Sequence, residues 1–165
     1  AAQRLKAKGG YDAVLIADNA RFAVQAAPQL KAPGAALPRI LGPELWNGEG
    51  AIYSSPALRG ALFAAITDSR FRTFSDSYKT RFGAAPYRLA TMGYDSVLLS
   101  IRIARDWQPG SPFPLARMTD TGGFLGIDGP FRFGPTGVIE RALEVRQVQA
   151  KGVAIVSPAP DKFSD

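Results

Sequence analysis

The chain has 165 residues, of which 46% are hydrophobic and 21% are charged, and it carries a formal net charge of +6. This balance is typical of a folded globular protein, and the length suffices for a compact core. The sequence contains no cysteine and no histidine, which excludes disulfides and metal sites built from these residues. The positive residues are scattered, so we expect no nucleic-acid partner. The longest apolar runs, residues 13–17 and 61–66, are too short to cross a bilayer.

The first eight residues (AAQRLKAK) lack the apolar stretch of a signal peptide. We interpret them as the last turns of an amphipathic helix that ends at Gly9 and Gly10. A chain that starts on the end of a helix is expected to be part of a longer protein, so we predict a partial fold.

Strands and helices are expected to alternate through the first 68 residues. Residues 11–17 (YDAVLIA) form a short apolar run, which predicts a strand buried on both faces. Asn19 then caps a helix that runs to about residue 31, is weakened at Pro28 and stops at residues 33–34. The apolar side of this helix is expected to hold Phe22, Val24, Ala26, Ala27 and Leu30.

Two more strands are predicted at residues 39–42 (RILG) and 60–66 (GALFAAI), with a short helix at residues 51–58 between them. The order strand, helix, strand, short helix, strand is typical of a doubly wound α/β sheet. The predicted fold class is therefore α/β, with a parallel sheet and flanking helices.

The middle of the chain predicts two helices. The first begins at residues 68–69 and ends at Gly83, and the second covers about residues 87–107 after Pro86. Both carry apolar residues at helical spacing, which we interpret as core rather than as a stacking platform. These residues are Phe71, Phe74, Tyr78 and Phe82 in the first helix, and Leu89, Met92, Val97, Leu98, Ile101 and Ala104 in the second.

The end of the chain changes to an antiparallel pattern. Residues 122–130 are rich in turn residues, and residues 131–133 (FRF) predict a short strand. Residues 138–148 alternate well enough for one long strand, and a turn at residues 150–152 leads back into residues 153–156. We therefore expect a C-terminal antiparallel hairpin.

Read in order, several segments resemble the type I periplasmic binding proteins, the family of the branched-chain amino-acid receptors. The segments are residues 11–16 (YDAVLI), 40–42 (ILG), 74–78 (FSDSY), 93–97 (GYDSV) and 124–129 (FLGIDG). Within this superfamily, residues 41–46 (LGPELW), 129–133 (GPFRF) and 156–160 (VSPAP) are most similar to the bacterial penicillin-binding-protein activators.

The resemblance implies two α/β lobes joined by crossing segments, with a ligand cleft between them, of which this chain is the C-terminal part. Residues 1–68 are expected to belong to one lobe. Residues 69–165, with the helical pair and the hairpin, are expected to belong to the other lobe and to the crossover region.

The resemblance also implies a function. The first expectation is a periplasmic regulatory module that modulates peptidoglycan synthesis by binding a peptidoglycan synthase. Its parent protein would be an outer-membrane lipoprotein, anchored by an N-terminal lipid outside this chain. The alternative is an ABC-transporter solute-binding protein, which holds an amino acid or a similar small polar ligand for a permease. Neither function uses a cofactor.

Enzymatic catalysis has little support in the residues. A Ser–His or Cys–His site is excluded, and no glycine-x-serine-x-glycine elbow is present. Glu44 and Glu49 resemble a carboxylate pair, but two acidic residues on one loop are usually solvated. No calcium-binding loop is visible. We therefore predict a protein that is not an enzyme and has no metal site.

Candidate ligand-binding residues lie where α/β sheets bind ligands, at the carboxyl ends of the strands. Asp18 and Asn19 end the first strand, and Glu44 and Trp46 follow the second. In amino-acid-binding relatives, carboxylates and aromatic rings hold an ammonium group and an apolar side chain, which these residues can also do. Two alternatives stay open, since Asp18 and Asn19 also suit a helix cap and Trp46 also suits packing against its loop.

Overall fold

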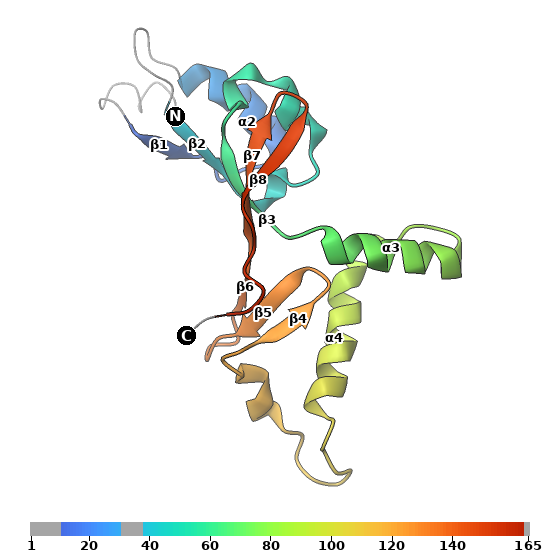
Figure 1. Cartoon of the computed structure of the whole chain (residues 1–165). Coiled ribbons are helices and arrows are strands. Elements are labelled where there is room, and N and C mark those ends of the chain that lie inside the picture. The colour runs from blue at the N-terminus through green and yellow to red at the C-terminus, as the bar shows by residue number, and fades with distance from the viewer. Residues whose placement is uncertain (1–10, 31–37, 164–165) are drawn as a thin grey trace. The chain divides into compact units, whose positions relative to one another are not determined.

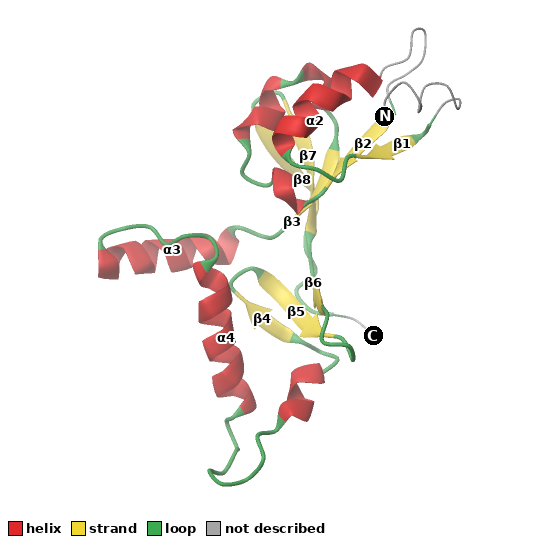
Figure 2. Ribbon diagram, turned by 180° about the vertical axis from the view of Figure 1, so that it is seen from behind, coloured by secondary structure: helices red, strands yellow, loops and turns green. Residues whose placement is uncertain are grey.

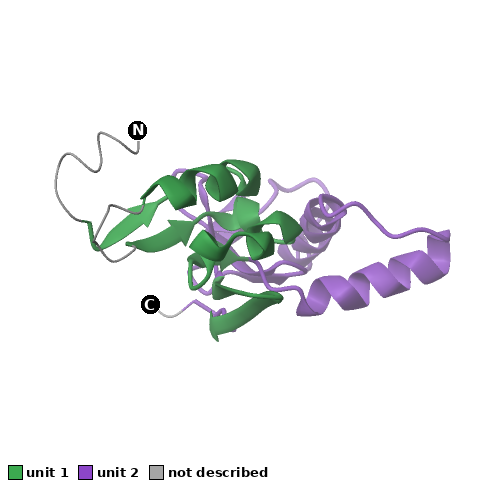
Figure 3. Ribbon diagram, turned by 90° about the horizontal axis from the view of Figure 1, so that it is seen from above, with its two compact units in different colours: residues 1–65, 144–158 green, residues 66–143, 159–165 purple. Residues whose placement is uncertain are grey.

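A computed structural model describes residues 11–30 and 38–163, and the chain divides into two compact units (Figure 3). Unit 1 comprises residues 1–65 and 144–158, and unit 2 comprises residues 66–143 and 159–165. The predicted helix end at residues 1–10 and the helix stop at residues 33–34 lie outside the described residues.

Unit 1 is built on a five-stranded sheet in the order β1-β2-β3-β7-β8 (Figure 1). The first three strands are parallel, as predicted, and the last two form the predicted antiparallel hairpin. The prediction grouped this hairpin with residues 69–165, whereas β7 pairs with β3 inside unit 1. The strands are β1 (Ala13–Leu15), β2 (Arg39–Gly42), β3 (Leu62–Ala65), β7 (Glu144–Gln149) and β8 (Gly152–Ser157).

Helix α2 (Ala20–Ala26) begins at Asn19, whose side-chain oxygen accepts a hydrogen bond from the Phe22 N–H at 3.0 Å. The α-helix gives way to a 3-10 turn at Ala27–Leu30, because Pro28 has no N–H to continue the helical ladder. The residues that pack inward are Ala20, Ala23 and Ala27. Phe22 is about half exposed, so the predicted apolar side of the helix is wrong at this position.

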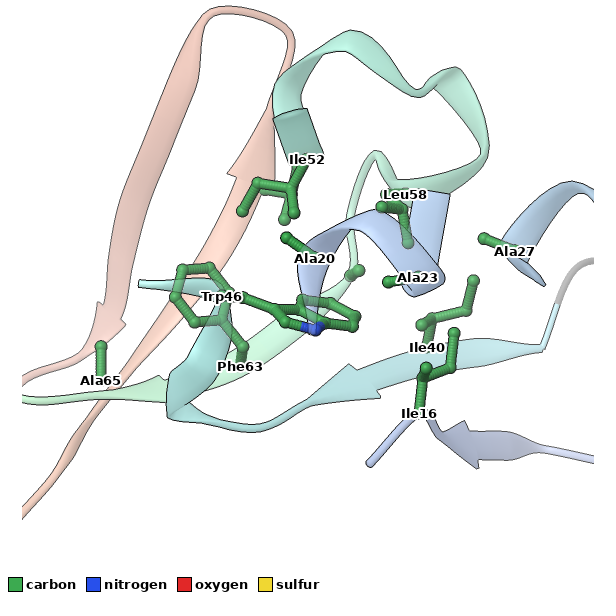
Figure 4. Packing of buried hydrophobic residues seen from close by; sticks show 12 residues of the cluster. Ile16, Ala20, Ala23, Ala27, Ile40, Trp46, Ile52, Leu58, Phe63 and Ala65 are labelled. Carbon is green, nitrogen blue, oxygen red and sulfur yellow. The ribbon is translucent and has the colours of Figure 1, made fainter. Parts of the chain in front are cut away.

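The core of unit 1 lies on one face of the sheet, under α2 and three 3-10 turns (Figure 4). These turns are Glu44–Trp46, Gly50–Ser54 and Pro56–Leu58, so the helix predicted over residues 51–58 is instead a pair of tight turns. On the opposite face Leu15 of β1 is 62% exposed. The prediction that this strand is buried on both faces is therefore wrong for the described part of unit 1. The largest core side chains are Ile16, Ile40, Trp46, Ile52, Leu58 and Phe63.

Unit 2 combines two helices with a three-stranded antiparallel sheet in the order β4-β5-β6 (Figure 2). Helix α3 (Ser69–Phe82) ends at Gly83, which adopts the left-handed conformation (φ 79°) that glycine tolerates best. Helix α4 (Ala90–Ile103) is shorter than predicted. The strands are β4 (Phe124–Gly126), β5 (Gly129–Phe133) and β6 (Ile139–Arg141).

The long strand predicted over residues 138–148 is wrong. It divides at Ala142 and Leu143 into β6 and β7, which belong to different sheets. Ala142 donates its backbone N–H to the Pro130 carbonyl at 2.9 Å, so the chain is still held to β5 where β6 ends.

The helices of unit 2 differ most from the sequence-based expectation. No residue of α3 is buried, and the apolar residues of α4 that were predicted to form core are largely exposed. The buried residues of α4 are instead Thr91, Asp95 and Ile103. Among the described residues, no helix has the length and apolar character needed to span a membrane.

Candidate functional site

The predicted ligand residues of unit 1 lie along the carboxyl ends of β1 and β2, which we name the carboxyl edge (Asp18, Asn19, Glu44 and Trp46). The Asn19 backbone N–H donates to the Asp18 carboxylate at 2.7 Å, while the Asn19 side chain caps α2. Both of these residues therefore serve the helix cap that the sequence also allowed. The cap leaves the Asp18 carboxylate in a partly exposed position.

Trp46 is fully buried (Figure 4). Its indole N–H donates to the Asp18 backbone carbonyl at 2.9 Å, and its ring lies 6.1 Å from that of Phe63. A Cβ added at Gly42 would overlap the indole ring, so the strand approaches the ring as only glycine allows. The sequence predicted that the Trp46 ring would contact a ligand. In the structure the ring is buried instead, and its N–H holds the backbone carbonyl of Asp18.

A buried ion pair extends the carboxyl edge onto β7. Glu144 and Arg146 are both buried and joined by an Nη2–Oε1 distance of 2.5 Å. Arg146 also donates through Nη1 to the side-chain oxygen of Asn47 at 2.7 Å. Sequence reasoning missed these three residues, although charged residues alternating on one strand face were a visible signal. They tie the loop after β2 to the start of β7.

Two carboxylates give the carboxyl edge its chemical character. Asp18 and Glu44 are partly exposed, and Glu44 makes no side-chain hydrogen bond or ion pair within the described part of the chain. Carboxylates in such positions accept charge-assisted hydrogen bonds from ammonium or guanidinium groups. No group of three or more acidic residues that could hold a metal ion occurs among residues 11–30 and 38–163.

Unit 2 holds a second polar cluster, centred on Arg88. Its guanidinium donates to Asp128 at 2.8 Å and to Asp68 at 3.1 Å, and it lies 4.0 Å from the centre of the Phe71 ring. Thr91 donates its hydroxyl to the other Asp128 oxygen at 2.7 Å. The cluster therefore ties the turn between β4 and β5 to the starts of α3 and α4.

Asp95 holds the same turn from the middle of α4. Its carboxylate accepts the Ile127 backbone N–H at 2.9 and 3.1 Å. Burial raises the pKa of Asp95, and the neighbouring Asp128 charge raises it further, while the Ile127 N–H and Arg141 oppose the rise. The Asp95 carboxylate is therefore engaged by the backbone of the turn between β4 and β5.

No protein-family model matches the sequence, and no curated protein matches it either. Solved structures, in contrast, match nearly the whole chain. A branched-chain amino acid ABC transporter protein from Rhodospirillum rubrum matches 94% of this chain with a TM-score of 0.72 at 22% identity. The fold is that of the type I periplasmic binding proteins. The predicted fold class and resemblance are thereby confirmed.

Two further matches show the range of proteins that share this type I fold. The transporter substrate-binding protein LivJ from Streptococcus pneumoniae, solved with isoleucine, matches 95% of the chain at 18% identity and a TM-score of 0.53. The C-domain of LpoA from Haemophilus influenzae, a regulator of PBP1A, matches 94% at 15% identity and a TM-score of 0.60. Identities this low show the type I fold alone.

The chain spans about half the length of the three matched proteins named above. The matched part is 47% of the Rhodospirillum rubrum and LivJ chains and 48% of the LpoA domain. More than half of each of these chains therefore has no counterpart in this one.

Proposed function

We propose that this chain is a regulatory binding module of a periplasmic protein, which modulates peptidoglycan synthesis by contact with a synthase and performs no catalysis of its own. The structural match to the LpoA C-domain, a regulator of PBP1A, supports the proposal. So does the sequence, which has no histidine or cysteine for nucleophilic or acid–base catalysis. LivJ, another matched protein, is a transporter substrate-binding protein solved with isoleucine.

The observation that carries the proposal is the engagement of the carboxyl edge in the protein's own fold. An amino-acid site needs an apolar surface for the side chain beside polar groups for the ammonium and carboxylate. Trp46, the aromatic candidate, is fully buried and hydrogen-bonded internally, and Asn19 caps α2. With its one aromatic member buried, the carboxyl edge presents mainly two partly exposed carboxylates, which favours a module that acts through protein contact.

The proposal is tested by measuring whether the protein binds a synthase and changes its activity. The protein in its natural polypeptide would be immobilised and exposed to a purified synthase of the PBP1A class, and glycan polymerisation would be followed with and without it. We expect saturable binding and a change in the polymerisation rate. Absence of both effects would refute the regulatory function.

A second candidate function, an amino-acid receptor, is favoured by one specific feature. Asp18 and Glu44 present partly exposed carboxylates at the sheet edge where α/β proteins bind ligands. A thermal-shift panel of amino acids tests it, because a ligand at a hundred times its Kd stabilises the folded state by about 2.7 kcal/mol. A shift that is lost in Asp18→Ala or Glu44→Ala, but kept in the exposed control Glu49→Ala, would establish the receptor function.

Asn19 needs a separate variant because of its second role. Removing the cap with Asn19→Ala is expected to destabilise α2 by about 1 kcal/mol regardless of any ligand. Asn19→Ser keeps a capping oxygen and removes the amide, so it reports on ligand contact alone.

A further inference from the structure

Strand β8 ends the sheet of unit 1, so one of its sides has no neighbouring strand in the described part of the chain (Figure 1). Its six residues (GVAIVS) carry no charge and include no proline. Ile155 and Val156 are 57% and 49% exposed. Natural proteins usually protect the edges of their sheets with charged residues, prolines or a covering element, because unpaired backbone groups attract another strand. The residues of β8 itself provide neither a charge nor a proline for this protection.

The hydrogen bonds of β7 show how the backbone groups of the hairpin are oriented. The Val148 N–H donates to the Ala61 carbonyl, and the Val148 carbonyl accepts the Gly60 N–H, both at 2.9 Å. The backbone groups of Val148 therefore point away from β8. Backbone groups alternate between the two sides of a strand, so those of Gln147 and Gln149 point toward β8.

The same alternation identifies the outward-facing residues of β8. Gly152 and Ala154 are the register partners of Gln149 and Gln147, so their N–H and carbonyl groups are used on β7. Val153 and Ile155 alternate with them and direct their N–H and carbonyl groups away from the sheet. Beyond Ile155 the register with β7 shifts, so the regular part of the edge ends there. Val153 and Ile155 thus form the outer edge of the hairpin.

We propose that this edge is a dimer surface, on which β8 of a second copy of this chain pairs antiparallel about a twofold axis at Ala154. In this register Val153 of each copy lies opposite Ile155 of the other, and each pair exchanges two backbone hydrogen bonds. Hydrogen-bonded positions in an antiparallel ladder are two residues apart, which is the separation of Val153 and Ile155. The edge is therefore complementary to itself, as a twofold interface requires.

The side chains of β8 fit the same register. Val153 packs against the core of unit 1, and Ile155, two residues on and thus on the same face, is largely exposed. Pairing brings Val153 of one copy beside Ile155 of the other, and β-branched pairs across strands stabilise a sheet. On the opposite face the two Ala154 side chains meet. Their small size suits the closer approach of a position without hydrogen bonds.

Charge favours the antiparallel arrangement of the two copies. Lys151, in the turn before β8, is exposed and lies opposite the uncharged Ser157 of the other copy in this register. The two Lys151 residues are then about 20 Å apart at about 3.4 Å per residue. Salt screens exposed charges over about 8 Å, so they do not oppose the pairing. A parallel pair in register would instead place the two lysines side by side, which destabilises a sheet.

The absence of cysteine from residues 1–165 permits a direct test with single thiols. In the proposed dimer the Cα atoms of the two Ala154 residues are about 4.5 Å apart, within the range that a disulfide spans. Ser157→Cys is the matched control, because Ser157 is exposed on the same strand and its two copies are about 20 Å apart. Both variants are made in the natural polypeptide that contains this chain, with any cysteine outside residues 1–165 replaced by serine.

Under mild oxidation we expect Ala154→Cys to form a disulfide-linked dimer about tenfold or more faster than Ser157→Cys. Equal rates for the two variants would overturn the proposal, because they would show random collision. Absence of a disulfide in Ala154→Cys would overturn it as well.

A second measurement needs no cysteine. Sedimentation equilibrium of the unmodified protein is expected to show a monomer–dimer equilibrium, and Ile155→Lys is expected to weaken it about tenfold or more. The two introduced lysines would lie diagonally across the paired strands, about 7–8 Å apart. Val138→Lys makes the same change at a residue that is 66% exposed and lies outside β8, and it is expected to leave the dimer unchanged. A protein that stays monomeric up to about 1 mM, or a dimer equally stable in Ile155→Lys, would overturn the proposal.

Hydrogen exchange distinguishes a second copy from another protein at this edge. The amide protons of Val153 and Ile155 are expected to exchange more slowly as the concentration of the protein rises. Slowing that occurs only when a purified synthase is added would overturn the dimer and assign the edge to the synthase. The dimer does not depend on the regulatory function proposed above, since self-association and synthase binding are measured separately.

Discussion

Replacing Glu144 with glutamine is expected to destabilise unit 1 by about 3–5 kcal/mol, because it neutralises a buried carboxylate that lies against the buried guanidinium of Arg146. The side chains of Glu144 and Arg146 are only 5% and 9% exposed. An exposed ion pair contributes roughly 0–1 kcal/mol, so burial accounts for the size of the expected loss. The variant keeps the shape of the side chain and isolates the effect of its charge.

Urea unfolding followed by tryptophan fluorescence measures this loss. The chain has two tryptophans, of which Trp46 lies in unit 1 and Trp107 in unit 2. A Trp107→Phe background therefore restricts the signal to unit 1. Glu49→Gln makes the same chemical change at an exposed position of unit 1 and is expected to stay within about 0.5 kcal/mol of the parent.

The reasoning is refuted if Glu144→Gln has no larger effect than Glu49→Gln. A double variant sharpens the test. Glu144→Leu combined with Arg146→Met removes both charges and keeps much of the volume, so it is expected to recover most of the stability. A double variant less stable than Glu144→Gln would show that the loss came from packing rather than from charge.

Three further outcomes follow from single contacts. Gly42→Ala inserts a methyl into the space of the Trp46 ring and is expected to lower the free energy of unfolding by about 1–3 kcal/mol. Gly50→Ala, whose Cβ meets no atom within 4 Å, is expected to stay within about 0.5 kcal/mol in the same urea assay. Trp46→Phe removes the indole hydrogen bond and is expected to lose about 1–3 kcal/mol. Because this change also removes the fluorophore of unit 1, its urea unfolding is followed by far-UV circular dichroism, and an unchanged stability would contradict the positioning role of Trp46. Because burial raises the pKa of Asp95, the folded state holds this proton more tightly than the unfolded state, and stability falls as pH rises from the ordinary value of 3.8 through the raised one. Asp95→Asn keeps an acceptor for the Ile127 N–H and is expected to lose this part of the pH dependence, which urea unfolding across that pH range would detect.

The elements that the sequence predicted well depend on local chemistry. Asn19 caps α2 because its short side chain reaches the N–H of the first turn, and Gly83 ends α3 because glycine tolerates a positive φ. The turn that leads into β8 is equally local. These patterns involve only a few neighbouring residues, so they can be recognised without knowledge of the tertiary fold.

Which side chains are buried was harder to predict, because burial depends on which other elements of the fold pack against them. The spacing of Val97 and Ile101 on α4 indicates an apolar side but cannot show whether another element covers it, and both residues are largely exposed. Glu144 and Arg146 raised the opposite difficulty, since charged residues on a strand are normally taken to face solvent. One acceptor of Arg146 is Asn47, 99 residues away in the chain. No local pattern contains a pairing over such a separation.

The carboxyl edge also marks where the chain leaves and re-enters unit 1. The chain leaves after Ala65 and returns at Glu144, and these two residues lie opposite each other in the β3–β7 register. Glu144 is one half of the buried ion pair, whose other half reaches the loop after β2. A ligand or partner can shift a conformational equilibrium only through contacts that differ between states. Asp18 and Trp46 are already joined to each other, and Asn47 is joined to Arg146, so this part of the carboxyl edge is preformed in the folded chain. A partner that bound there would need to order only the side chain of Glu44.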